Sequence, residues 1–164
     1  MINKVYLDMD GVLCNFELRY FERYGEMPGS MRDKKNFNKY WDDFVLTKQF
    51  ETLDLYPGAR DLLDFLKDYN VSIEILSSSG GEKYHEEVKK QKRVWLDTHN
   101  IPFKANIVSG RKNKALYAND NVVLIDDTYD VIRAFIDAGG HAIHHKTIGN
   151  TLALLKNHLD KEHI

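Results

Sequence analysis

Short apolar runs alternate along the chain with longer stretches in which apolar residues recur every three or four positions. The runs have the length of β-strands, and the longer stretches have the period of amphipathic helices. The expected strands span residues 4–7, 71–76, 105–108, 122–125 and 142–144. The expected core helices span residues 59–66, 83–99, 131–138 and 152–159. This alternation predicts an α/β fold with a doubly wound parallel sheet and helices on both faces.

A segment of different character follows the first strand. Residues 14–55 are dense in aromatic side chains with charged residues between them. Phe16, Tyr20 and Tyr24 recur every four residues, which predicts one face of a helix, and a second helix is expected over residues 35–46. We therefore expect a small helical cap. The α/β core would comprise residues 1–13 and 56–164.

The composition limits the classes of function. A chain of 164 residues fits one domain with a small insertion. Its net charge of −2 gives no sign of a surface for nucleic acid, and no run approaches the roughly 20 apolar residues of a membrane helix. The single cysteine, Cys14, cannot form an internal disulfide and reads as a small buried residue. We expect a cytoplasmic protein without membrane or nucleic-acid partners, and a homodimer stays open.

Polar side chains follow the ends of the first four core strands. The residues, in chain order, are Asp8 and Asp10, Ser77 and Ser78, Lys112 and Lys114, and Asp126 and Asp127. The carboxyl ends of parallel strands meet at one edge of a doubly wound sheet, where ligands bind. Carboxylates, hydroxyls and a cation would then share one crevice. These are the groups that phosphoryl transfer requires.

The pair Asp8 and Asp10 is the centre of this prediction. Neighbouring carboxylates repel each other unless a cation lies between them or one takes up a proton. Oxygen ligands of this kind suit Mg²⁺, which also binds substrate phosphate. Asp-x-Asp followed by Gly11 is also a common turn sequence. The polar residues at the other strand ends favour the catalytic interpretation.

The order of these motifs is similar to that of the haloacid dehalogenase (HAD) superfamily of phosphohydrolases: DMDGV, an apolar strand ending in serine, a basic residue, and an apolar strand ending in DD. More narrowly, DMDGVLCNFE resembles the DMDGVLADFE opening of the 5′(3′)-deoxyribonucleotidases. The segments LYPGARDLLDFL, KRVWLDTHNIPF and VVLIDD also resemble that family. The resemblance covers nearly the whole chain, and the family has a cap at the place of residues 14–55.

The resemblance implies a catalytic and metal-binding set. Asp8 would attack phosphorus to form an aspartyl phosphate. Asp10 would protonate the leaving alkoxide and then activate water. Mg²⁺ would be held by Asp8, the backbone carbonyl of Asp10 and the pair Asp126 and Asp127, with Asp127 the favoured direct ligand.

The resemblance also implies a phosphate-binding set. Ser77 would bind a phosphate oxygen through its hydroxyl, helped by the backbone N–H of Ser78. Lys114 would neutralise the remaining charge, with Lys112 as the competing candidate. The family places its lysine closer to the DD pair than either residue lies here.

The cap is expected to recognise the substrate, because aromatic side chains suit a planar base. Phe16 matches a phenylalanine of the family, and Trp41 and Phe44 are further candidates. The predicted function is a magnesium-dependent phosphatase for nucleoside monophosphates, by preference deoxy. The alternatives are a phosphatase for a sugar phosphate or other small phosphomonoester, a binding protein without turnover, and an enzyme acting on nucleic-acid ends.

Overall fold

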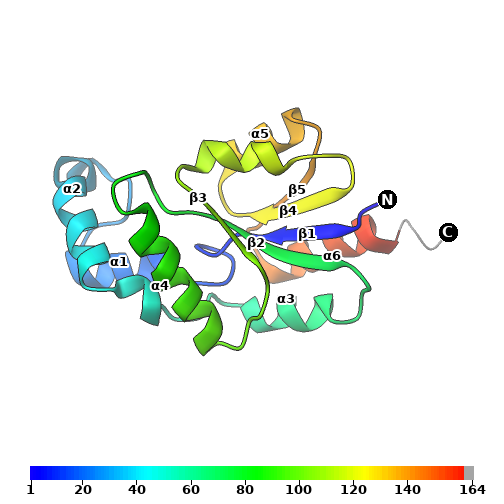
Figure 1. The fold of residues 1–164 in the computed structure, drawn as a ribbon, viewed down its shortest axis with the longest axis horizontal. Coiled ribbons are helices and arrows are strands. Elements are labelled where there is room, and N and C mark those ends of the chain that lie inside the picture. Colours follow the sequence, from blue (N-terminus) through cyan, green and yellow to red (C-terminus); the bar gives the residue numbers. More distant parts are fainter. Residues whose placement is uncertain (161–164) are drawn as a thin grey trace.

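The structure, a computed structural model, describes residues 1–160, so the last four residues of the expected core range lie outside the described residues. Five parallel strands form one sheet in the order β3-β2-β1-β4-β5 (Figure 1). The strands are β1 Lys4–Leu7, β2 Ser72–Ser78, β3 Ala105–Val108, β4 Val122–Asp126 and β5 His141–His144. The chain runs from the central β1 to one edge and then returns to the other side of β1. The predicted doubly wound α/β fold is confirmed, and such a reversal is where these folds bind ligands.

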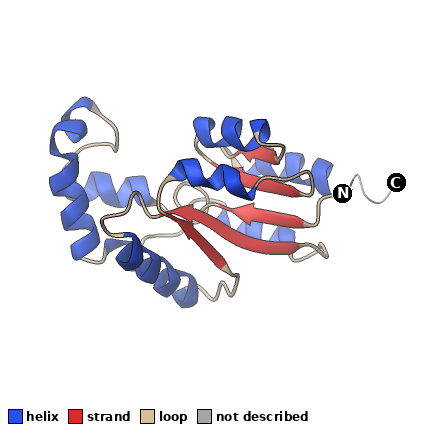
Figure 2. Ribbon diagram, turned by 45° about the horizontal axis from the view of Figure 1, so that its top comes forward, coloured by secondary structure: helices blue, strands red, loops and turns tan. Residues whose placement is uncertain are grey.

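Helices cover both faces of the sheet (Figure 2). Their bounds are α3 Ala59–Leu66, α4 His85–Thr98, α5 Tyr129–Asp137 and α6 Ile148–Asp160. Successive strand residues alternate between the two faces: Val123 and Ile125 pack in the larger apolar cluster with α3, α4 and α6, whereas Val122 and Leu124 pack in the smaller one with α5. This alternation follows from the two-residue period of a strand. Among the described helices, none is both long and apolar enough to cross a membrane.

Two strands end later than the apolar pattern indicates. β2 continues through Ser77 and Ser78, which pair with Ile107 and Val108 of β3, and β4 continues through Asp126. The ladder, rather than hydrophobicity, keeps these polar residues in strand conformation. Ser77 and Ser78 therefore point to opposite sides of the sheet, which decides their different places in the site.

The cap follows β1 and lies beyond the carboxyl ends of the strands (Figures 1 and 2). It consists of α1 Phe16–Tyr24, α2 Met31–Leu46 and the 3₁₀ helix η1 Gln49–Thr52. α2 begins four residues before the expected helix at Lys35, because the Ser30 hydroxyl accepts a hydrogen bond from the Asp33 N–H (3.1 Å) and caps the helix. Phe44 is fully buried in the cap and belongs to the same apolar cluster as β1.

Helix α4 fastens the cap to the core. The Gln91 amide donates to the Val45 carbonyl (2.8 Å), and the Trp95 indole N–H donates to the Leu53 carbonyl (2.7 Å). Gln91 and Trp95 are fully buried. Two buried hydrogen bonds thus join the cap to α4.

Candidate active site

A cavity of about 760 Å³ opens at the carboxyl ends of the strands. Four strand-end loops and the cap line it. The lining includes Asp8, Asp10 and Gly11 after β1, Ser78 at the end of β2 with Gly80 and Gly81 after it, Arg111, Lys112 and Lys114 after β3, Asp127 and Thr128 after β4, and Phe16, Glu17 and Trp41 from the cap. The topology therefore brings together residues that lie far apart in the sequence.

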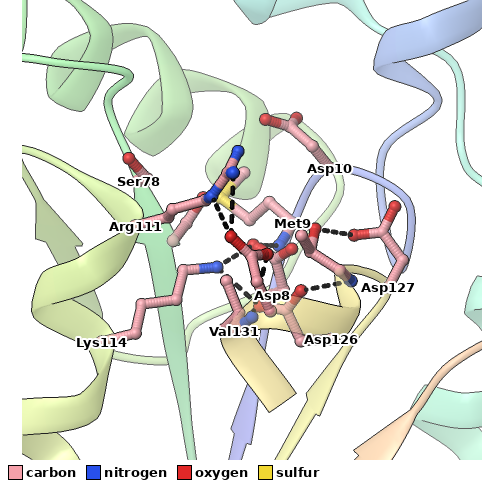
Figure 3. Close-up of polar contacts among 12 residues, drawn as sticks. Asp8, Met9, Asp10, Ser78, Arg111, Lys114, Asp126, Asp127 and Val131 are labelled. Carbon is pink, nitrogen blue, oxygen red and sulfur yellow. Dashed lines mark hydrogen bonds and ion pairs between the residues drawn. The ribbon is translucent and has the colours of Figure 1, made fainter. Parts of the chain in front are cut away.

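Three carboxylates converge at the base of this cavity (Figure 3). One oxygen each of Asp8, Asp126 and Asp127 lies within 4.8 Å of the others. Burial, followed by the charge of Asp126, raises the pKa of Asp8 well above its ordinary value. Burial and the charges of Asp126 and Asp10 raise the pKa of Asp127 to about 7. The carboxylates are crowded enough that a cation would stabilise their ionised forms.

Lys114 lies against two of these carboxylates. Its Nζ is 3.1 Å from Asp8 Oδ1 and 2.7 Å from Asp126 Oδ2, and all three side chains are buried. Burial opposes the charged form of Lys114, but the two carboxylates outweigh it and raise the pKa of the ammonium. The 3₁₀ helix η2, Arg111–Tyr117, turns Lys114 inward, and it leaves Lys112 exposed at the cavity wall.

The carboxylate oxygens of Asp126 and Asp127 differ in their hydrogen-bond partners. Asp126 Oδ2 accepts from Lys114, and its Oδ1 accepts from the Thr128 N–H (2.9 Å). Asp127 Oδ1 accepts from the Thr128 hydroxyl (3.3 Å), and its Oδ2 lies over the α carbon of Gly11. Asp127 lines the cavity, whereas Asp126 is fully buried. The geometry favours Asp127 for direct contact with a cation.

Asp10 lies apart from the carboxylate group (Figure 3). Its Oδ2 is 3.2 Å from Lys92 Nζ. Its Oδ1 is buried and has no hydrogen-bond partner in the part of the chain that the structure describes. Asp10 thus has one oxygen held by the Lys92 ammonium and one buried oxygen without a partner among the described residues.

The two predicted serines occupy different places. Ser78 lines the cavity, and its Oγ accepts from the Gly80 N–H (3.0 Å). Ser77 is fully buried beneath the cavity wall, and its Oγ accepts from Lys92 Nζ (2.7 Å). The hydroxyl expected at the cavity surface is therefore that of Ser78, and the phosphate contact predicted for Ser77 stays a prediction.

The cap aromatics divide in the same way. Phe16 and Trp41 line the cavity. Trp41 packs against the loop after β2, where a Cβ on Gly80 would lie 2.6 Å from Trp41 Cζ2. Phe44 is 0% exposed and contacts Phe16 and Phe50 within the cap core, so it does not reach the cavity wall. Aromatic character alone could not show that Phe44 is buried by its neighbours in the cap instead of lining the cavity.

Lys92 is a residue of this site that the sequence pattern did not single out. It lies in the charged run of α4 and reads as a solvated lysine. Its spacing in the sequence could have identified it, because Val88, Lys92 and Trp95 fall on one face of the helix, and that face is buried. A lysine on an apolar stripe needs an ionic or polar partner.

The fold has relatives among solved structures. A HAD-superfamily hydrolase from Ehrlichia chaffeensis is 16% identical, with a TM-score of 0.56 over 95% of this chain and 97% of that chain. A hydrolase from Streptococcus pneumoniae is 16% identical, with a TM-score of 0.58 over 94% of this chain and 98% of that chain. D,D-heptose 1,7-bisphosphate phosphatase from Burkholderia thailandensis is 12% identical, with a TM-score of 0.52 over 93% and 84%. The fold is that of the HAD superfamily.

The family follows from the sequence comparison. The model of the family described as "5' nucleotidase, deoxy (Pyrimidine), cytosolic type C protein" matches residues 1–151, and the chain belongs to this family. A search of curated proteins found no match. The predicted resemblance is confirmed, and the protein is an enzyme, a phosphatase of the HAD superfamily.

Proposed function

We propose that the protein is a magnesium-dependent hydrolase of (deoxy)nucleoside monophosphates that acts through an aspartyl phosphate on Asp8. One observation carries the proposal: Asp8, Asp10, Lys114 and Asp127 line one cavity that Phe16 and Trp41 of the cap also line. The family supports a nucleotide as substrate. The cytosolic type in its description supports a cytoplasmic location.

The donor set fits Mg²⁺. Asp8 and Asp127 supply carboxylate oxygens, and burial together with the charge of Asp126 raises the pKa of both carboxyl groups, so a cation between them would stabilise their ionised forms. These two carboxylates and the Asp10 carbonyl would hold the ion, with Asp126 behind them held by Lys114 and Thr128. When bound, Mg²⁺ would neutralise the carboxylates and the phosphate oxygens.

The proposed reaction has two steps. A carboxylate oxygen of Asp8 forms a bond to phosphorus while the bond to the leaving alkoxide breaks, and Asp10 gives its proton to that alkoxide. Asp10 then takes a proton from water, the water oxygen bonds to phosphorus, and the acyl phosphate bond breaks. Inorganic phosphate leaves, and Asp8 and Asp10 return to their starting states.

Phosphate binding would use hydrogen-bond donors that still have a hydrogen free after their contacts within the protein are counted. An ammonium has three hydrogens, and Lys114 uses two of them on Asp8 and Asp126, so one remains for a phosphate oxygen. The Ser78 hydroxyl accepts from the Gly80 N–H and keeps its own hydrogen for donation. We assign phosphate binding to Lys114 and Ser78, with Ser77 as a further candidate.

The cap would select the leaving group. Phe16 and Trp41 offer apolar ring surface beside the catalytic carboxylates, which suits a nucleobase. A sugar phosphate would find hydrogen-bonding partners in Glu17 and Arg111 at the same cavity, but a sugar ring has no planar aromatic surface to stack on Phe16 and Trp41. The aromatic wall therefore favours the nucleotide over the sugar phosphate.

A phosphate-release screen tests the proposal. Purified protein is assayed on nucleoside and deoxynucleoside 5′- and 3′-monophosphates and on sugar phosphates, with Mg²⁺ and with a chelator. We expect the protein to hydrolyse nucleotides with Mg²⁺ but not with the chelator, and we expect Asp8→Asn to abolish this activity. Faster turnover of sugar phosphates than of any nucleotide would overturn the substrate assignment. Equal rates in wild type and Asp8→Asn would overturn the mechanism.

A further inference from the structure

Lys92 is a buried cation directly beneath the proposed acid and base. Its side chain is 1% exposed, and its Nζ lies 5.2 Å from the centre of the Phe50 ring in the cap. An ammonium in such a place is costly unless its hydrogens are all bonded. Its position in α4, the helix that holds the cap, places it between the cap and the catalytic loop.

All three hydrogens of this ammonium have acceptors. Lys92 Nζ donates to Ser77 Oγ (2.7 Å), to the Ser78 carbonyl (2.9 Å) and to Asp10 Oδ2 (3.2 Å). A lysine has three donors and no acceptor, so none is left for a substrate. Lys92 is also absent from the cavity lining, in contrast to Lys114, which lines it and has a hydrogen to spare. The hydrogen bonds of Lys92 therefore go to Asp10 and to β2.

We propose that Lys92 is a positioning residue that fixes the carboxyl group of Asp10 for proton transfer, an inference that rests on the proposed function. By binding Oδ2, Lys92 makes the two oxygens of Asp10 inequivalent. The other oxygen, Oδ1, is buried and has no hydrogen-bond partner among residues 1–160, so the contact from Lys92 is the polar contact that orients the carboxyl group. Two of the contacts, to Ser77 and to the Ser78 carbonyl, anchor the ammonium to β2. Through Lys92, the Asp10 carboxyl group is thus tied to the sheet.

This role predicts a dependence on the leaving group. A nucleoside monophosphate leaves as an alkoxide and needs the proton of Asp10, whereas p-nitrophenyl phosphate leaves as a stable phenolate and does not. Loss of Lys92 would slow phosphoenzyme formation from the nucleotide and spare it for p-nitrophenyl phosphate. Breakdown of the phosphoenzyme needs Asp10 as base with either substrate, so it would be slow with both.

The test uses Lys92→Met, with Lys89→Met as the matched control because Lys89 is an exposed lysine of the same helix. Asp10 is 31% exposed, so water can solvate its carboxylate when Lys92 is removed, and we expect the variant to fold. Lys92→Gln, which is neutral and keeps an N–H donor, replaces it if circular dichroism shows that the Met variant is unfolded. Lys89→Met should behave as wild type.

We expect Lys92→Met to lower kcat on a nucleotide by about 10–100-fold, a part of the range for general acid and base catalysis. With p-nitrophenyl phosphate, rapid mixing should show a first-turnover burst of nitrophenolate close to that of wild type, followed by slow turnover. Acid-quenched protein should carry more phosphate than wild type. In an Asp10→Asn background, Lys92→Met should cost little more, because Lys92 acts through Asp10.

Other outcomes would overturn the inference. Equal losses on both substrates without a burst, or a loss that adds fully to that of Asp10→Asn, would show that Lys92 supports structure or binds phosphate. Wild-type rates in Lys92→Met would show that Asp10 needs no positioning. These results are separate from a failure of the proposed function, in which wild type itself would release no phosphate from nucleotides or p-nitrophenyl phosphate.

Discussion

Gly11 and Asp127 pack so closely that a side chain on Gly11 has no space. A Cβ at Gly11 would lie 1.9 Å from Asp127 Oδ2, and the backbone of Gly11 has a φ of 83°, which side chains disfavour. The glycine after the two aspartates therefore does more than turn the chain. It lets the carboxylate that follows β4 reach the loop that follows β1.

Gly11→Ala is predicted to displace Asp127 and so to disable the proposed magnesium site. Strain at a positive φ should also lower the free energy of unfolding by about 1–3 kcal/mol. Titration calorimetry measures the expected loss of Mg²⁺ binding, and an assay of phosphate release measures the expected loss of activity. Gly149→Ala is the control, because Gly149 has open space around its α carbon. Magnesium binding and activity at wild-type levels in Gly11→Ala would contradict the role of Asp127.

The raised pKa of Asp127, about 7, predicts how stability depends on pH in the metal-free protein. An aspartate in the unfolded chain has a pKa of about 3.9. Between these two pKa values the folded protein binds more protons than the unfolded chain. The contribution of Asp127 to the free energy of unfolding therefore falls as pH rises from about 4 to about 7, and it falls no further above pH 7. Removing the charge should therefore stabilise the protein most at high pH.

Asp127→Asn is thus predicted to be more stable than wild type by about 1–3 kcal/mol at pH 8, and to gain little at pH 4. Urea unfolding in a chelator at several pH values measures the difference. Asp120→Asn is the control, since Asp120 is exposed on the surface. Added Mg²⁺ should reverse the order at pH 8 by stabilising wild type alone. A variant less stable than wild type without metal at pH 8 would contradict the crowding of these carboxylates.

Lys114→Met is predicted to lower kcat by about 100-fold or more, because it removes the cation that faces both Asp8 and the phosphate. Lys112→Met should cost less than about 10-fold, since Lys112 is exposed at the cavity wall. Breaking the buried ion pairs of Lys114 should also destabilise the fold by about 3–5 kcal/mol, so the folded fraction is measured by circular dichroism. A larger loss in Lys112→Met would reverse the assignment.

The apolar pattern predicted much of the fold because it is a direct record of burial. The bounds of β1 and β3 are those expected, since each is a short strand that stops where its pattern stops. The pattern could not show that β2 runs through Ser77 and Ser78, because a sheet ladder pairs backbones whatever the side chain. It also missed the start of α2, although Ser30 followed by Asp33 is a capping signal.

The site shows the same division. Motif order brought Asp8, Asp10 and Asp127 to one cavity in the prediction and in the structure. Lys112 and Lys114 could not be separated by spacing, because the apolar pattern indicates no helix over residues 111–117, and residues two apart in a 3₁₀ helix point in different directions. Lys92 was missed because its partners come from other elements, Asp10 from the loop after β1 and Ser77 from β2.

The central claim is that the carboxylate of Asp8 becomes phosphorylated during turnover. Protein quenched in acid within the first turnovers of a nucleotide in Mg²⁺, digested and examined by mass spectrometry, tests it directly. The account predicts a phosphoryl group on the peptide that contains Asp8, more of it in Asp10→Asn, and none in Asp8→Asn. Phosphate release at wild-type rates with no modified peptide, or with the phosphoryl group on another residue, would contradict it.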